Sequence, residues 1–219
     1  MSDVANKVET LLEAMPYLQK YAGKTVVVKY GGNAMINAEL KDAVMHDIVL
    51  LKLLGLRPVL SHGGGPGINK MLETLNIPVQ FINGLRYTSE DTMRVVEAVL
   101  VGQVNTELVG YLNKIGGRAV GLSGVSGDIY HCHRRSEELG FVGDIDYVDP
   151  SAINAVLDAG FIPVVAPVGT DFSEELAKKV LTEHDITVVV RFHQGSGYAK
   201  AFGCDLTYDY VKINGDYRS

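Results

Sequence analysis

One segment combines three consecutive glycines with flanks that predict a turn between a strand and a helix. Residues 58–60 form a short apolar run, residues 61–70 contain Gly63, Gly64 and Gly65, and an amphipathic stretch follows. Glycines let backbone N–H groups approach a ligand closely, and the following helix points the positive end of its dipole at the same place. The segment is therefore predicted to bind an anion.

A second glycine turn and two cations extend this prediction. Lys29 follows the β-branched run at residues 25–28 and is followed by Gly31 and Gly32. A lysine beside backbone amides suits a phosphoryl group, because transfer from ATP needs charge compensation and positioning more than covalent help. Arg86 has the planar geometry to hold a substrate carboxylate with two hydrogen bonds.

Two common nucleotide-binding patterns fail at the turn that contains Gly63–Gly65. A dinucleotide turn starting at Gly63 would need glycine where Ile68 stands, and a Walker loop would need Gly-Lys-Ser/Thr where residues 69–71 read Asn-Lys-Met. The alternative interpretations are a solvated strand-end charge for Lys29, purely structural glycines, and a surface ion pair for Arg86.

The composition narrows the class of protein. The 219 residues are 47% hydrophobic, which is ample for a packed core, and the formal net charge of -6 gives no basic footprint for nucleic acid. We find no signal-type apolar segment, and Lys52 interrupts the apolar run at residues 48–56. Two cysteines fit a reducing compartment. We expect a cytoplasmic protein without nucleic-acid or membrane partners.

The elements that must position these residues alternate along the chain. Apolar periodicity and glycine stops predict helices at 4–22, 40–54, 68–75, 89–115 and 150–158. Continuous apolar runs predict buried strands at 25–28, 58–62, 119–122 and 161–166, and residues 128–133 and 141–148 predict a hairpin. This order predicts an α/β fold, a three-layer sandwich with a mostly parallel sheet and both glycine turns at carboxyl ends of strands.

The pattern changes near residue 170. Residues 173–219 predict a helix, a strand, a hairpin into a second strand, and a C-terminal helix. The predicted domains are therefore 1–169 and 170–219, the second a short α+β tail.

Residues 1–169 resemble the N-terminal half of the acetylglutamate kinases, members of the amino acid kinase family. The matching segments are VKYGGNAM (28–35), HGGGP (62–66), NGLR (83–86), GRAVG (117–121) and PVVAPVG (163–169). The resemblance implies phosphorylation of the γ-carboxylate of N-acetylglutamate with ATP and Mg²⁺, within arginine biosynthesis.

The resemblance also implies roles for individual residues. Lys29 would stabilise the transferring phosphoryl group, and Gly31 and Gly32 would lie against the ATP phosphates. Gly64 and Gly65 would bind the reacting side of the substrate, and Arg86 its α-carboxylate. The N-terminal helix resembles the extension that joins dimers into hexamers in arginine-inhibited members, which implies a homo-oligomer and arginine as an inhibitor.

The tail resembles a different family. Residues 201–214, AFGCDLTYDYVKIN, are similar to the C-terminal end of ornithine acetyltransferases. That resemblance implies substrate contacts by Asn214 and Ser219, the latter in place of a threonine. The chain is interpreted as a fusion of two arginine-pathway segments, natural or rearranged. Because the ATP-binding half of the kinase is missing, impaired activity is expected.

Several other residues are given structural roles. A metal site at His131, Cys132 and His133 is disfavoured relative to an exposed hairpin edge. His62 is predicted to form a structural hydrogen bond, because phosphorylating a carboxylate removes no proton. Cys204 is interpreted as a packed residue, and Asp205, Asp209 and Asp216 as a solvated helix face. No metal ligands are predicted.

Two alternative functions stay open. One is a non-catalytic module that binds acetylglutamate or oligomerises, and the other is an ornithine acetyltransferase fragment that needs a partner chain. Ending the kinase sheet near residue 166 is expected to expose apolar surface unless the strands of the tail or another subunit cover it.

Overall fold

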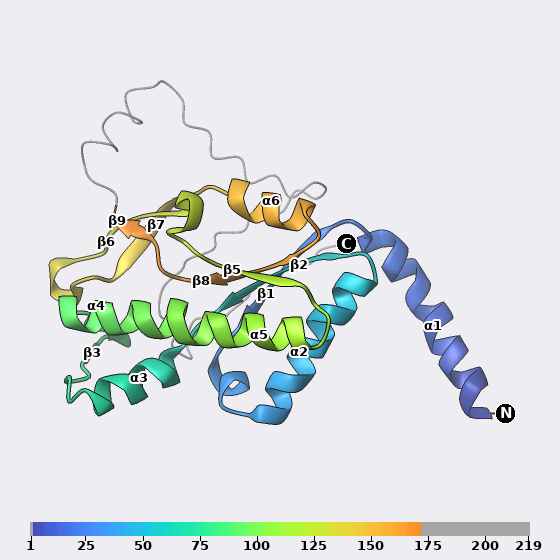
Figure 1. The fold of residues 1–219 in the computed structure, drawn as a ribbon, viewed down its shortest axis with the longest axis horizontal. Helices are drawn as coiled ribbons and strands as arrows, with labels where there is room; N and C mark the ends of the chain where they lie inside the picture. The colour runs from blue at the N-terminus through green and yellow to red at the C-terminus, as the bar shows by residue number, and fades with distance from the viewer. Residues whose placement is uncertain (1, 172–219) are drawn as a thin grey trace, which may run out of the picture.

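A four-stranded parallel sheet forms the centre of the molecule (Figure 1). The computed structural model describes residues 2–171. The strand order is β1 (Thr25–Tyr30), β2 (Arg57–His62), β8 (Ile162–Ala166), β5 (Ala119–Ser123). The predicted elements of the tail, with Asn214 and Ser219, lie outside the described residues.

Helices cover both faces of this sheet, which confirms the predicted three-layer α/β fold. Along β2 and β8, Leu60 and Val164 point to one face, while Val59 and Val165 point to the other. This alternation is the period of a strand buried on both sides. The helices on the first face are α2 (Ala38–Leu53), α3 (Gly65–Thr74) and the long helix that contains α4 and α5. The other face carries α6 (Ser151–Asp158).

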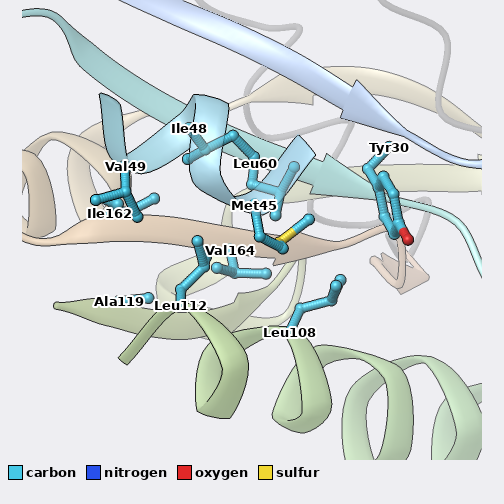
Figure 2. Packing of buried hydrophobic residues seen from close by; sticks show 10 residues of the cluster. All are labelled: Tyr30, Met45, Ile48, Val49, Leu60, Leu108, Leu112, Ala119, Ile162 and Val164. Carbon is cyan, nitrogen blue, oxygen red and sulfur yellow. The ribbon is translucent and has the colours of Figure 1, made fainter. Parts of the chain in front are cut away.

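The main core lies between the sheet, α2 and α5 (Figure 2). It consists of Tyr30, Met45, Ile48, Val49, Leu60, Leu108, Leu112, Ala119, Ile162 and Val164. A second cluster joins α3 and the long helix to the end of β8, through residues such as Leu72, Val99 and Ala166. The glycine turn after β2 therefore sits on packed apolar side chains.

The long helix departs from the prediction in its middle third. It runs from α4 (Glu90–Glu97) through a π-helix, η2 (Ala98–Asn105), to α5 (Thr106–Lys114). The sequence predicted one regular helix over 89–115. By length and composition this helix could cross a membrane, a test that core helices also pass, and its buried side chains pack on the sheet.

Helix α1 (Ser2–Tyr21) confirms the predicted N-terminal helix and extends away from the sheet (Figure 1). Its apolar side chains Val8, Leu12 and Met15 are exposed. A surface helix with an uncovered apolar stripe is typical of an interaction segment.

Two small sheets lie beyond the carboxyl ends of the central strands. One is the hairpin of β3 (Phe81–Ile82) and β4 (Leu85–Arg86). The other has the order β7-β6-β9, with the strands β6 (Tyr130–Arg134), β7 (Gly143–Val148) and β9 (Thr170–Asp171). The predicted hairpin is confirmed. The prediction of an exposed edge is wrong for His131 and Cys132, which pair with β9, whereas His133 lies beyond this pairing and is exposed. The described residues also include short 3₁₀ turns at Gly32–Met35, Ser126–Asp128 and Glu137–Leu139.

Two glycines near α5 should respond oppositely to alanine. A Cβ at Gly121 would overlap Asn105 Oδ1, whereas a Cβ at Gly110, in the middle of α5, would meet nothing within 4 Å. We expect Gly121→Ala to lower the free energy of unfolding by about 1–3 kcal/mol through overpacking. Gly110→Ala should raise it by about 0.5–1 kcal/mol through helix propensity. Urea denaturation of both variants checks this, and a stabilised Gly121→Ala would contradict the packing described.

Candidate functional site

The two predicted glycine turns lie side by side at the carboxyl ends of β1 and β2. These strands pair in parallel, with Tyr30 opposite His62. The Gly63 N–H donates to the Tyr30 carbonyl oxygen at 2.9 Å, so the pairing continues into the second turn. The carboxyl ends of parallel strands are where open α/β sheets bind ligands.

The first turn is open around its glycines. Lys29 is exposed and pairs in register with Ser61. Gly32 has a positive φ of 61°, a conformation that favours glycine, and a Cβ at Gly31 or Gly32 would meet nothing within 4 Å. Tyr30 Oη donates to the Ala34 carbonyl at 2.8 Å and closes the turn. Burial raises the pKa of the Tyr30 phenol, with a further contribution from Glu107, so the group stays a neutral donor.

The glycines of the second turn divide into two kinds. A Cβ at Gly64 would overlap Leu100 Cδ2, and one at Gly67 would lie 3.1 Å from Val99 Cγ1. A Cβ at Gly65 would meet nothing within 4 Å. Gly64 and Gly67 therefore permit close packing on the π-helix, whereas Gly65 begins α3 with an open face. The first N–H groups of α3 have no partner within the helix and can serve an anion.

Arg86 reaches the same region from β4. Its side chain is only 3% exposed, and its guanidinium lies 4.9 Å from the centre of the Phe81 ring. Nη2 donates to Oδ1 of Asn69, which lies on α3 five residues after Gly64. The buried position argues against the alternative of a surface ion pair. The structure thus ties Arg86 to the helix that the glycine turn begins.

His62 has the structural role that the sequence predicted. It is 2% exposed, with Nδ1 2.8 Å from the Gly63 carbonyl oxygen and Nε2 3.1 Å from Nδ2 of Asn105. Burial lowers the pKa of the imidazole, and the hydrogen bond to Gly63 opposes this effect more weakly. The imidazole is therefore neutral near pH 7 and contributes no positive charge to the site.

Asn105 is a site-supporting residue that the sequence analysis missed. Besides His62, its Nδ2 contacts the carbonyl oxygens of Val164 at 2.8 Å and Leu122 at 3.2 Å. One side chain thus connects β2, β8 and β5. The signal was present in the spacing: the apolar stripe of this helix recurs every four residues, at positions 96, 100, 104, 108 and 112. Such uniform spacing is too wide for 3.6 residues per turn and fits a π segment better.

A cavity of about 290 Å³ adjoins Asn105 between the long helix and β5. Its lining residues are Val101, Asn105, Thr106, Val109, Gly121, Leu122, Ser123 and Ser126. The lining carries no charged group, so the cavity does not match the anion chemistry of the glycine turns.

The histidines of β6 are engaged with carboxylates. His131 Nε2 lies 3.3 Å from Asp128 Oδ2, and His133 Nδ1 lies 2.7 Å from Asp146 Oδ1. Within residues 2–171, no group of three or more His, Cys, Asp or Glu side chains gathers in a way that could hold a metal ion.

Comparison with known proteins identifies the class that this fold and site define. The sequence model of the amino acid kinase family matches residues 24–189. The chain belongs to the amino acid kinase family.

The more particular similarity is to acetylglutamate kinases. The chain is 50% identical to that of Carboxydothermus hydrogenoformans over 186 residues, which cover 80% of this chain and 63% of the relative. It is 51% identical to that of Gloeobacter violaceus over 172 residues, which cover 76% of this chain and 57% of the relative. The chain thus spans about three fifths of the length of these curated relatives.

Solved structures agree on the fold. The protein smu.665 of Streptococcus mutans superposes with a TM-score of 0.60 at 30% identity, covering 69% of this chain and 60% of that one. The N-acetylglutamate synthase of Neisseria gonorrhoeae, solved with coenzyme A and N-acetyl-glutamate, superposes with a TM-score of 0.62 at 24% identity. That match covers 75% of this chain and 38% of the synthase. The predicted likeness of the tail to ornithine acetyltransferases stays a prediction.

The neutral state of His62 should appear in the pH dependence of stability. Because the folded state lowers the pKa of this imidazole, the unfolded chain binds more protons below about pH 6.5. Stability should therefore be highest above that pH and fall as the pH drops, with a slope from this group of at most about 1.4 kcal/mol per pH unit. His62→Gln should flatten the profile of unfolding free energy between pH 7 and 5.

Exposed His46 supplies the control for this measurement. His46→Gln is measured in parallel, and the flattening assigned to His62 is the difference between the two variants. Identical profiles for wild type and His62→Gln would show that His62 is not held neutral by the fold.

Proposed function

We propose that the chain is an acetylglutamate kinase-like protein of arginine biosynthesis and binds N-acetylglutamate at the carboxyl ends of β1 and β2. The observation that carries the proposal is the juxtaposition of the turn at Lys29 and the turn at Gly63–Gly65 on paired parallel strands. The sequence identity of 50% and 51% to two acetylglutamate kinases supports the choice of substrate.

The proposed reaction brings two anions together, and the site's residues offset their repulsion. ATP, when bound, supplies the phosphoryl group that becomes linked to a γ-carboxylate oxygen as the bond to the leaving ADP breaks. Lys29 neutralises charge on the transferring group from the end of β1. The amides of Gly64 and Gly65, at the positive end of α3, hold the reacting carboxylate.

Arg86 holds the other end of the substrate in this proposal. Its guanidinium, packed on Phe81 and bonded to Asn69, is oriented before the substrate arrives. A preformed planar cation favours a carboxylate that accepts two parallel hydrogen bonds. Fixing the α-carboxylate orients the γ-carboxylate toward the glycine turn.

The residues of the first turn fit nucleotide phosphates. Gly31 and Gly32 leave room for close approach, because a Cβ at either would meet no atom within 4 Å. Mg²⁺ does not fit as an ion held by described side chains alone, since no cluster of ligands gathers among residues 2–171. It would enter with the phosphates of ATP.

A second candidate is a module that associates with other subunits through α1 and binds N-acetylglutamate without turnover. The exposed apolar side chains Val8, Leu12 and Met15 of α1 support association with other subunits.

Turnover distinguishes the two candidates. We expect slow release of ADP from Mg-ATP that depends on N-acetylglutamate, and Lys29→Ala should reduce it to the rate without N-acetylglutamate. Lys24→Ala, at the opposite end of β1, serves as the matched control and should keep the wild-type rate. Equal rates in wild type and Lys29→Ala would rule out catalysis by this chain and leave the binding module.

Binding tests the substrate itself. Arg86→Lys should weaken N-acetylglutamate binding by at least about tenfold in calorimetry, because a lysine cannot form the two parallel bonds worth about 1.5–3 kcal/mol. Arg94→Lys is the control, since exposed Arg94 bonds to Glu90 one turn away in α4. Undiminished affinity in Arg86→Lys would place the α-carboxylate elsewhere.

A further inference from the structure

We infer that Asn105 is a positioning residue of the glycine turn: it fixes the His62 imidazole in the tautomer that anchors the Gly63 carbonyl and thereby aims the Gly64 amide. The placement of Asn105 and His62 rests on their own contacts. Only the consequence for N-acetylglutamate rests on the proposed function.

The orientation of the Asn105 amide follows from its neighbours. Its Nδ2 faces two backbone carbonyls, of Val164 at 2.8 Å and Leu122 at 3.2 Å. Turning the amide over would place Oδ1 against both carbonyl oxygens, so the nitrogen must face them. Asn105 is 5% exposed, and its Oδ1 lies over Gly121, where any Cβ would overlap it. The side chain therefore has one orientation available.

This orientation determines where His62 carries its proton. The Nδ2 group of Asn105 can only donate, so His62 Nε2, at 3.1 Å, cannot carry a proton toward it and accepts, sharing the two N–H bonds of the amide with the two carbonyls. In a neutral imidazole the proton then sits on Nδ1, which donates to the Gly63 carbonyl at 2.8 Å. A free neutral imidazole favours the other tautomer, with the proton on Nε2. Asn105 is thus the group that selects the less common form.

The fixed Gly63 carbonyl orients the next amide. A trans peptide is planar, so the carbonyl of Gly63 and the N–H of Gly64 point in opposite directions from one rigid unit. The Gly63 N–H is itself held by Tyr30 at 2.9 Å. With both neighbouring groups anchored, the Gly64 N–H has one direction, even though glycine permits many.

The π-helix explains how Asn105 reaches this place. The segment Ala98–Asn105 supports the turn in two ways: Leu100 and Val99 pack on Gly64 and Gly67, and Asn105 bonds to His62. In a regular helix, residues five positions apart point about 140° apart around the axis, so Leu100 and Asn105 would not both face the turn. A π segment brings residues five apart into line.

The histidine spectrum tests the inference directly. Long-range ¹H–¹⁵N NMR of the full chain should show His62 as the Nδ1–H tautomer. Asn105→Ala should shift it toward Nε2–H and move the Gly64 amide resonance. Asn113→Ala is the matched control: Asn113 lies on α5 and bonds to β5 at Ala119, at the opposite end of the strand. It should change neither signal.

Two outcomes would overturn the inference. The first is an Nε2–H tautomer of His62 in the wild type. Because this outcome needs no variant, the inference can be tested even if Asn105→Ala does not fold. The second is a folded Asn105→Ala variant whose His62 and Gly64 signals are the same as in the wild type.

Calorimetry with N-acetylglutamate measures the consequence for the ligand. Asn105→Ala should weaken binding about tenfold, the upper range for a lost hydrogen bond, and Asn113→Ala less than about twofold. An unchanged affinity with a changed tautomer would overturn the positioning role. If the wild type does not bind N-acetylglutamate, the proposed function fails, and the His62 and Gly64 signals alone decide the inference.

Discussion

The parallel pairing of β1 with β2 is the constraint on which the candidate site depends. Because the strands run in the same direction and in register, the residues that follow Tyr30 and His62 emerge at one edge of the sheet. The bond from Gly63 to Tyr30 carries that pairing one residue into the turn. This register brings Lys29 and the glycines of both turns close to the N-terminus of α3. A shift by one residue would send them to opposite faces.

The glycines of the site serve two physical purposes that their sequence does not distinguish. Gly31, Gly32 and Gly65 leave space open toward solvent, whereas Gly64 and Gly67 allow a helix to pack closely from behind. The first kind makes room for a ligand, and the second supports the backbone that would contact it. A turn that must be both accessible and rigid needs both kinds.

Much of the fold could be predicted from local pattern. The β-branched run before Lys29 and the apolar run before the three glycines gave β1 and β2, because strands buried on both faces read as continuous apolar residues. The neighbouring turns followed from the parallel order of these strands. The hydrogen bond of His62 was predicted on a different ground, because phosphorylating a carboxylate removes no proton. The resemblance to the amino acid kinase family rested on short segments that all lie within the region that the family match covers.

The features that escaped prediction depend on contacts between distant segments. The middle position of β6 requires β9, some forty residues later in the chain. The role of Asn105 requires carbonyls from β5 and β8. From the sequence alone, a polar residue next to the apolar stripe of a helix is expected to face solvent. The strands that Asn105 contacts are known only from the fold. The π segment was readable only from a spacing of four that a regular helix also tolerates for two or three turns.

The partners of Asn105 have a consequence for how this protein tolerates mutation. Two of its three acceptors are backbone carbonyls, which are present whatever side chains stand at Leu122 and Val164. Substitutions in β5 and β8 can therefore be absorbed as long as the strands keep their places. Asn105 itself cannot be replaced in the same way, because no substitution at its partners can supply the N–H groups of its side chain. In a mutational scan, sensitivity should concentrate at one helix position while the strand positions that it contacts accept other apolar residues.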